Sequence, residues 1–182
     1  MHVTRRDWVF GSLGSAAWPV IAAAQEHAHR AATRPASARF EFFDDSTAAD
    51  VAAIAAQILP SDDGPGANEA GVVFFIDRAL HTFDADKQDL YRAGIKQVRD
   101  TARGMFPAAE SVAALSSGQQ FELVRAIEKS DFFEAVRVHT LLGFLGSPAY
   151  GGNRDRVGWK YIEFEDRMTW EPPFGHYDAE AK

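Results

Sequence analysis

Few side chains in this sequence stand at spacings that support catalysis. Ser116-Ser117-Gly118 lacks the Gly-x-Ser-x-Gly turn that exposes a nucleophilic serine, and no order of Ser, His and Asp residues suggests a catalytic triad. Neither a Gly-x-Gly-x-x-Gly motif nor a glycine-rich phosphate loop ending in Lys-Ser or Lys-Thr is present. We therefore predict that the chain has no catalytic residue and binds no nucleotide or flavin cofactor itself.

His139 is the one histidine that falls near an apolar helical stripe, three residues after Val136. We predict a hydrogen-bonded histidine of the core or of an interface. The alternative is a small independent enzyme in which His139 acts with a carboxylate such as Glu134 or Asp131. No Glu-x-x-His or His-x-x-x-His spacing accompanies His139 or His81, so no metal site is predicted.

Bulk composition excludes several further classes of function. The 182 residues include no cysteine, which excludes disulfides, iron–sulfur clusters, thiolate nucleophiles and haem attached through Cys-x-x-Cys-His. The formal charge of -7 argues against a nucleic-acid-binding protein, since phosphate contacts require a basic face. Beyond the N-terminal segment, no apolar stretch is long enough to span a bilayer.

The N-terminus has the features of an export signal. The pair Arg5-Arg6 precedes an apolar stretch, residues 8–24, which is diluted by Gly, Ser and Pro and ends in Ala22-Ala23-Ala24. We predict that residues 1–24 are a twin-arginine signal peptide, with Arg5 and Arg6 as its export residues, and that residues 25–44 are a linker. The protein is then expected in the periplasm, free or held at the membrane surface through a complex. The alternative is a short membrane anchor or an ordinary amphipathic helix.

Hydrophobic residues recur at helical spacing through the rest of the chain, and strand patterns are scarce. They predict helices at about residues 46–59, 72–80, 84–105, 117–127 and 131–144, of which the second should be the most buried. The expected N-caps are Ser46 or Thr47, Asp84, Ser116 or Ser117, and Asp131. Only the segment 157–164 leaves helix and strand both open. The predicted fold is all-α: one compact bundle of about five helices over residues 45–182, with a long irregular C-terminal loop and tail.

Two of these helices carry apolar stripes that predict which side faces the core. The stripe of the fourth helix consists of Phe121, Val124 and Ile127. The stripe of the fifth consists of Phe132, Val136, Thr140 and Phe144.

The most unusual segment lies between Leu141 and Lys160, where glycines alternate with aromatic and basic residues. Aromatic and Arg side chains on a shaped loop are typical of protein interfaces. The extended segment that begins at Trp170 is suited to lying across a neighbouring surface. The candidate interface residues are Tyr150, Gly151, Gly152, Asn153, Arg154, Trp159 and Trp170. Aromatic side chains that simply pack back on the bundle are the alternative, and both can hold together.

The sequence resembles the gluconate 2-dehydrogenase subunit 3 family, the small subunit of periplasmic sugar dehydrogenases. The residues that carry the resemblance are the twin-arginine start, the segment 58–67 (Ile-Leu-Pro-Ser-Asp-Asp-Gly-Pro-Gly-Ala), the segment 148–155 (Pro-Ala-Tyr-Gly-Gly-Asn-Arg-Asp) and Gly158-Trp159-Lys160. The likeness covers roughly residues 45–165.

The resemblance implies a non-catalytic subunit bound to a large FAD-dependent dehydrogenase of the glucose–methanol–choline (GMC) type. In that family the flavin subunit oxidises a sugar, sugar acid or polyol, and commonly passes electrons to a cytochrome c subunit that holds haem c. It often lacks its own export signal and travels with the small subunit through the twin-arginine translocase. A transient export chaperone, which releases its client after transport, is a further alternative.

Overall fold

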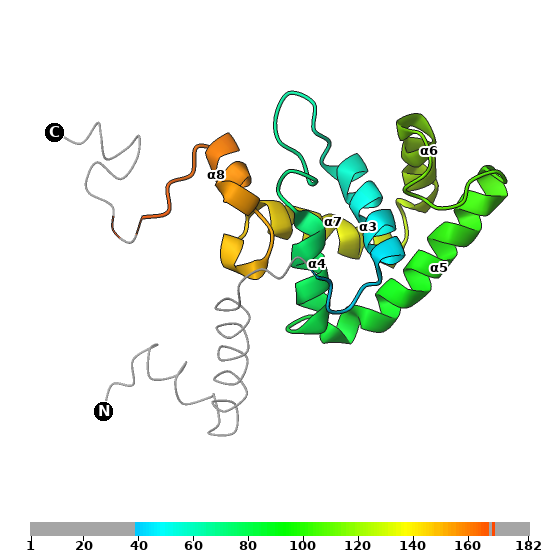
Figure 1. The fold of residues 1–182 in the computed structure, drawn as a ribbon, viewed down its shortest axis with the longest axis horizontal. Helices are drawn as coiled ribbons and strands as arrows, with labels where there is room; N and C mark the ends of the chain where they lie inside the picture. Colours follow the sequence, from blue (N-terminus) through cyan, green and yellow to red (C-terminus); the bar gives the residue numbers. More distant parts are fainter. Residues whose placement is uncertain (1–38, 168, 170–182) are drawn as a thin grey trace, which may run out of the picture.

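The computed structural model describes residues 39–167 and Thr169, and these residues form six α-helices and no strand (Figure 1). The helices are α3 (Asp45–Ile58), α4 (Val72–His81), α5 (Gln88–Met105), α6 (Ser117–Ile127), α7 (Asp131–Leu145) and α8 (Val157–Tyr161). The all-α prediction is therefore confirmed. The segment left open between helix and strand begins as the short helix α8.

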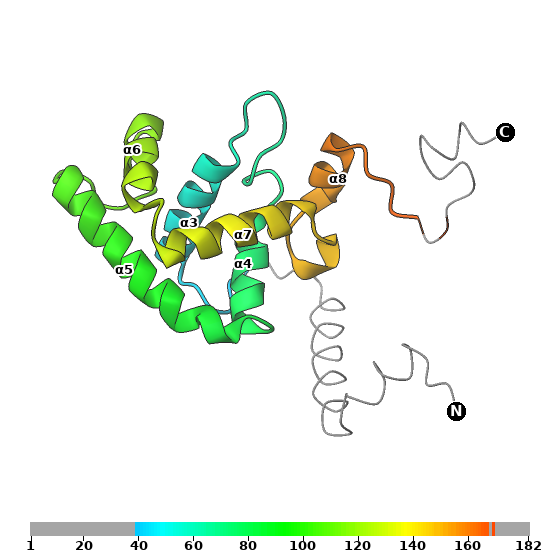
Figure 2. The ribbon, with the colours of Figure 1, turned by 180° about the vertical axis from the view of Figure 1, so that it is seen from behind.

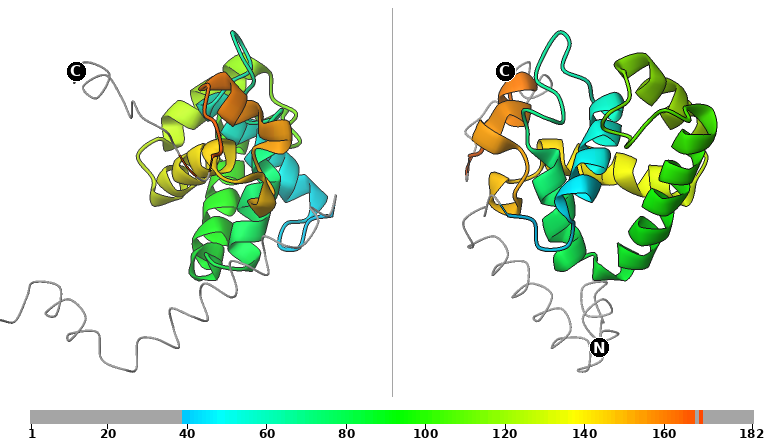
Figure 3. Two further views of the ribbon diagram at one scale, coloured as in Figure 1. Left: turned by 90° about the vertical axis from the view of Figure 1, so that its left-hand side faces the viewer. Right: turned by 45° about the vertical axis from the view of Figure 1, so that its right-hand side comes forward.

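Helices α3, α4 and α7 pack against one another and form the centre of the bundle. Figures 1 and 2 show α7 crossing α3 and α4, and Figure 3 shows α5 and α6 at one end with α8 at the other. Helix α4 is buried along most of its length, as its apolar sequence predicts. None of the helices in the described part of the chain combines the length and hydropathy needed to cross a membrane.

The helix starts differ from their predicted caps in two places. Asp44, rather than Ser46 or Thr47, caps α3, because its carboxylate accepts a hydrogen bond from the backbone amide of Thr47 at 2.6 Å. Ser130, rather than Asp131, caps α7 in the same way. In both cases the capping side chain comes one to three residues earlier, which leaves the predicted residues inside the first turn.

The other two starts are closer to expectation. Ser116 caps α6 in a capping box with Gln119, which confirms one of the two predicted residues. Asp84 precedes a 3-10 turn, Ala85–Lys87, that leads into α5, but its side chain makes no cap hydrogen bond. The Asp84 carboxylate instead accepts hydrogen bonds from Lys87 and His139.

The aromatic run before α3 is tied to α4 by one carboxylate. Buried Asp77 accepts hydrogen bonds from the backbone amides of Glu41, Phe42 and Phe43, at 2.8, 3.0 and 2.8 Å. Phe43 is thereby placed in the core. The predicted signal peptide and most of the predicted linker lie outside the described residues.

Candidate partner interface

The glycine-rich segment between α7 and α8 is a shaped loop that Asn153 holds against α7. The backbone amide of Asn153 donates to the carbonyl of Gly143 at 2.7 Å, and its side-chain amide donates to the carbonyl of Gly146 at 2.9 Å. Its side-chain oxygen accepts from the backbone amide of Gly158 at 2.9 Å. The Asn153 side chain is fully buried, so it stabilises the loop and does not reach the surface.

Three glycines, two in this loop and one in α8, lie where the backbone comes close to α4 or α7. A Cβ atom on Gly152 would lie 2.2 Å from the carbonyl oxygen of Gly143, and one on Gly158 would lie 2.0 Å from that of Phe144. Gly151 has a φ of +101°, which disfavours any side chain. Gly151 and Gly152, both predicted interface residues, are buried, so they set the shape of the loop.

Tyr150, Arg154 and Trp159 provide the surface of the loop. Tyr150 and Trp159 are half-buried and Arg154 is exposed. The indole Nε1 of Trp159 donates to the carbonyl of Leu145 at 2.6 Å, and its ring packs on Phe164. The two aromatic side chains therefore pack on the domain, while part of each remains accessible to solvent. Trp170 lies outside the described residues.

His139 belongs to a buried polar network. Its Nδ1 lies 2.8 Å from the Tyr91 hydroxyl, and its Nε2 lies 3.1 Å from Oδ2 of Asp84. Burial lowers the pKa of His139 despite the opposing effect of the hydrogen bond to Asp84, and burial raises the pKa of Tyr91. A neutral imidazole therefore accepts a hydrogen bond from the Tyr91 hydroxyl at Nδ1 and donates one from Nε2 to Asp84.

A hollow of about 290 Å³ lies beside this network, lined in part by Asp131, Glu134 and His139. Neither carboxylate pairs with His139, because Glu134 binds Arg137 and the partners of His139 are Asp84 and Tyr91. The alternative in which His139 acts with Glu134 or Asp131 therefore finds no support in these contacts. The imidazole is only 2% exposed, which suits a structural network. Within the described residues, no three His, Asp or Glu side chains gather as metal ligands.

The outer face of α7 carries a second apolar stripe, which was not predicted from the sequence. Val138, Leu141, Leu142 and Leu145 are 40–49% exposed, at positions i, i+3, i+4 and i+7. These four residues, named here the outer stripe, share one side of the helix. The inner face of α7 is the predicted one, since Phe132, Val136, Thr140 and Phe144 are all buried. Figure 2 shows α7 lying in front of α3 and α4.

A second group of exposed apolar side chains begins at the last residue of α8. Tyr161, Ile162 and Phe164 are each about half exposed. Trp159 connects this group to the outer stripe, through its hydrogen bond to the Leu145 carbonyl and its ring contact with Phe164.

The predicted stripe of α6 is wrong in one position, because Phe121 is exposed and Leu123 is buried in its place.

Comparison with known proteins gives a single result that bears on function. Residues 45–166 match the family model described as gluconate 2-dehydrogenase subunit 3. No curated protein and no solved structure matches the chain. The matched segment starts at α3 and runs past α8, so it includes the bundle, the outer stripe and the loop held by Asn153. The chain therefore belongs to the gluconate 2-dehydrogenase subunit 3 family.

Proposed function

We propose that this chain is a non-catalytic subunit that binds and stabilises the catalytic subunit of a flavin-dependent dehydrogenase and accompanies it through twin-arginine export. The family is named for a third subunit, which supports a role within a dehydrogenase complex. The observation that carries a binding role is the outer stripe of α7, four large aliphatic side chains left partly in water.

Such a stripe is unusual on a helix that already buries its other side. A helix that is apolar all round is normally enclosed by protein. Contiguous exposed apolar surface on a soluble domain marks an interaction site. The C-terminal half of α7, residues 138–145, contains no Asp, Glu, Lys or Arg, but the described residues enclose only one side of it. A partner subunit would cover the remaining half.

The loop held by Asn153 extends this surface. Trp159 and the group of Tyr161, Ile162 and Phe164 add aromatic area beside the C-terminal end of α7. Aromatic residues and Arg are enriched in the cores of interfaces. Arg154 stands exposed at the start of the same segment, with its guanidinium 5.0 Å from the ring centroid of Phe74. This arrangement supports one continuous docking surface of helix and loop.

The family resemblance supplies the chemistry of the proposed complex. The partner would be a large FAD-dependent subunit of the GMC type, acting on a sugar, sugar acid or polyol, with a cytochrome c subunit as electron acceptor. The flavin and the haem belong to those partners. This chain contributes binding surface and, through Arg5 and Arg6, the export signal.

The test is affinity purification of the tagged chain from the periplasm, followed by mass spectrometry and an absorption spectrum. We expect co-purification of a flavoprotein with an oxidised-flavin spectrum. A double change of Arg5 and Arg6 to Lys should remove both proteins from the periplasm. A colourless chain recovered without a partner would overturn the proposal.

A paired set of variants assigns the binding to the outer stripe. Leu141→Ser with Leu142→Ser should reduce the co-purified flavoprotein at least tenfold. Met105→Ser with Phe121→Ser also replaces two exposed apolar side chains, on α5 and α6, and should leave the yield unchanged. An equal loss with both pairs would contradict docking through α7.

A further inference from the structure

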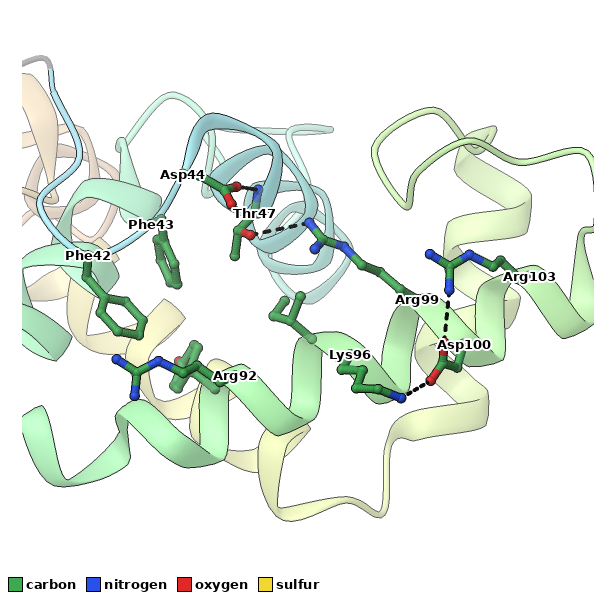
Figure 4. Close-up of a pocket in the computed structure, with 11 residues that line it drawn as sticks. Phe42, Phe43, Asp44, Thr47, Arg92, Lys96, Arg99, Asp100 and Arg103 are labelled. Atoms are coloured by element: carbon green, nitrogen blue, oxygen red, sulfur yellow. Dashed lines mark hydrogen bonds and ion pairs between the residues drawn. The ribbon is translucent and has the colours of Figure 1, made fainter.

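A second surface, formed by different elements, has the character of a binding groove. It has a volume of about 540 Å³ and lies between the segment 42–47 and one side of α5 (Figure 4). Phe42, Phe43 and Tyr91 give it an aromatic end. Its α5 side is lined by Arg92, Lys96, Arg99 and Arg103, which recur at helical spacing. An aromatic end followed by a row of cations is therefore built into one groove.

Cations and carboxylates are unevenly distributed along this groove. Asp44 and Asp100 are the carboxylates of the lining. Asp100 is shared between two cations, at 2.7 Å from Nζ of Lys96 and 2.9 Å from Nη1 of Arg103 (Figure 4). Arg92 pairs with Asp89 and Arg99 with Asp50, so the unbalanced cation lies between Lys96 and Arg103. This local excess favours an acidic ligand there.

The cations divide into one fixed group and three adaptable ones. Arg99 is fixed, because its Nε donates to buried Asp50 at 2.8 Å and its Nη2 reaches the hydroxyls of Ser46 and Thr47. Lys96 and Arg103 are exposed over 79% and 65% of their side chains. The pair between Arg92 and Asp89 is equally open to water. Ion pairs in water are weak, so these three cations can exchange partners at low cost.

The spacing of the cations selects the shape of the ligand. Arg92 and Arg103 are separated by about 16 Å along α5, at about 1.5 Å per residue. An extended peptide covers that length in about five residues, and its alternate side chains lie on one side at intervals of about 7 Å. Successive cations on α5 stand about 4.5–6 Å apart along the axis, within reach of such side chains.

We infer that this groove binds a short extended segment of a partner protein, with an aromatic residue followed by carboxylates at alternate positions. The aromatic residue packs at the end formed by Phe42 and Arg92, where the guanidinium already lies 5.1 Å from the ring centroid. The carboxylates bind Lys96 and Arg103 in place of Asp100. Recognition of acidic motifs by Arg clusters is an established mode of peptide binding. This contact goes beyond the proposed function, and its test requires no dehydrogenase.

The experiment uses a fluorescent peptide that begins with Trp and continues as alternating Ser and Glu, added to the purified full-length chain. Fluorescence anisotropy should show saturable binding that weakens as salt is raised. A peptide with Gln in place of Glu should bind at least tenfold more weakly. Equal binding of the two peptides would overturn the inference.

Matched variants locate the binding. Lys96→Gln with Arg103→Gln should weaken the Glu peptide about fivefold, the effect of losing two exposed ion pairs. Arg125→Gln with Lys129→Gln makes the same charge change at exposed positions near the end of α6 and should alter affinity less than twofold. Circular dichroism checks that both variants fold. An equal loss in both, or groove-dependent binding to phosphatidylglycerol vesicles without peptide binding, would overturn the inference.

Discussion

Over its C-terminal half, α7 carries apolar residues on both faces, but the two faces differ in what covers them. On the inner face, Phe132, Val136 and Phe144 are buried against α3, α4 and α5. The polar groups there are paired as well: Thr140 donates to the Val136 carbonyl, and His139 is held by Tyr91 and Asp84. On the outer face, the outer stripe remains 40–49% exposed.

This difference distinguishes the residues of α7 that stabilise the fold from those that are available to bind another protein. Burial of the inner face contributes to the stability of this chain alone. The outer stripe adds little to that stability, and its burial becomes favourable only when another protein covers it. Changes on the inner face should therefore reduce stability, whereas changes on the outer face should reduce binding.

The largest effect is expected at Phe132, which packs against Tyr91 with ring centroids 5.3 Å apart. Phe132→Ala should lower the free energy of unfolding by about 3–5 kcal/mol, because it leaves a cavity on the inner face. Urea denaturation followed by circular dichroism measures the change. A loss below about 1 kcal/mol would show that the inner face is not the core of this domain.

The next effect is expected at Asn153, where the loop meets the end of α7. Asn153→Ala removes the side-chain hydrogen bonds to the Gly146 carbonyl and the Gly158 amide, and should cost about 2–4 kcal/mol. The substitution should also increase the rate of amide hydrogen exchange more in residues 146–158 than in α4. An unchanged exchange rate in the loop would contradict the role assigned to Asn153.

A smaller, pH-dependent effect is expected at His139. Its pKa is lowered in the folded state, so the unfolded chain takes up a proton first as the pH falls. Stability should decline from about pH 6.5 downward, by at most about 1.4 kcal/mol per pH unit, and level off below the folded-state pKa. His139→Gln should flatten this slope, as measured by thermal denaturation between pH 5 and pH 8. A slope that stays the same in the variant would exclude His139 as its source.

The smallest effect on stability is expected on the outer stripe. Leu142→Ser should cost about 1 kcal/mol or less, since half of the Leu142 side chain already lies in water. The same urea denaturation provides the comparison with Phe132→Ala. A cost near that of Phe132→Ala would mean that the two faces of α7 do not differ as described.

The sequence was sufficient to predict the helices, because their apolar residues recur at helical spacing. It also predicted the buried side of α7, which carries Val136 and Thr140. It did not single out the second stripe, through Val138 and Leu141, because the elements that cover one side and leave the other open are distant in the sequence. The role of Asp77 was hidden for the same reason, since the backbone amides it binds lie 34 to 36 residues away.

The interface residues show the same limit. The density of glycine and aromatic residues indicated an irregular loop with a defined conformation, and the segment between α7 and α8 forms such a loop. The pattern could not show that Asn153 points inward while Trp159 stays at the surface, because both side chains suit either position. Tertiary contacts with the end of α7 make that choice.

The claim that a partner subunit covers the outer stripe can be tested by single-cysteine labelling, because the chain has no cysteine of its own. Leu142→Cys and Phe121→Cys place one thiol each on α7 and α6, at positions of similar exposure. Maleimide labelling of this chain is followed by mass spectrometry, alone and in the purified complex. We predict that the thiol at position 142 reacts at least tenfold more slowly in the complex, while the thiol at position 121 is unaffected. Equal reactivity at position 142 in both states would contradict the claim.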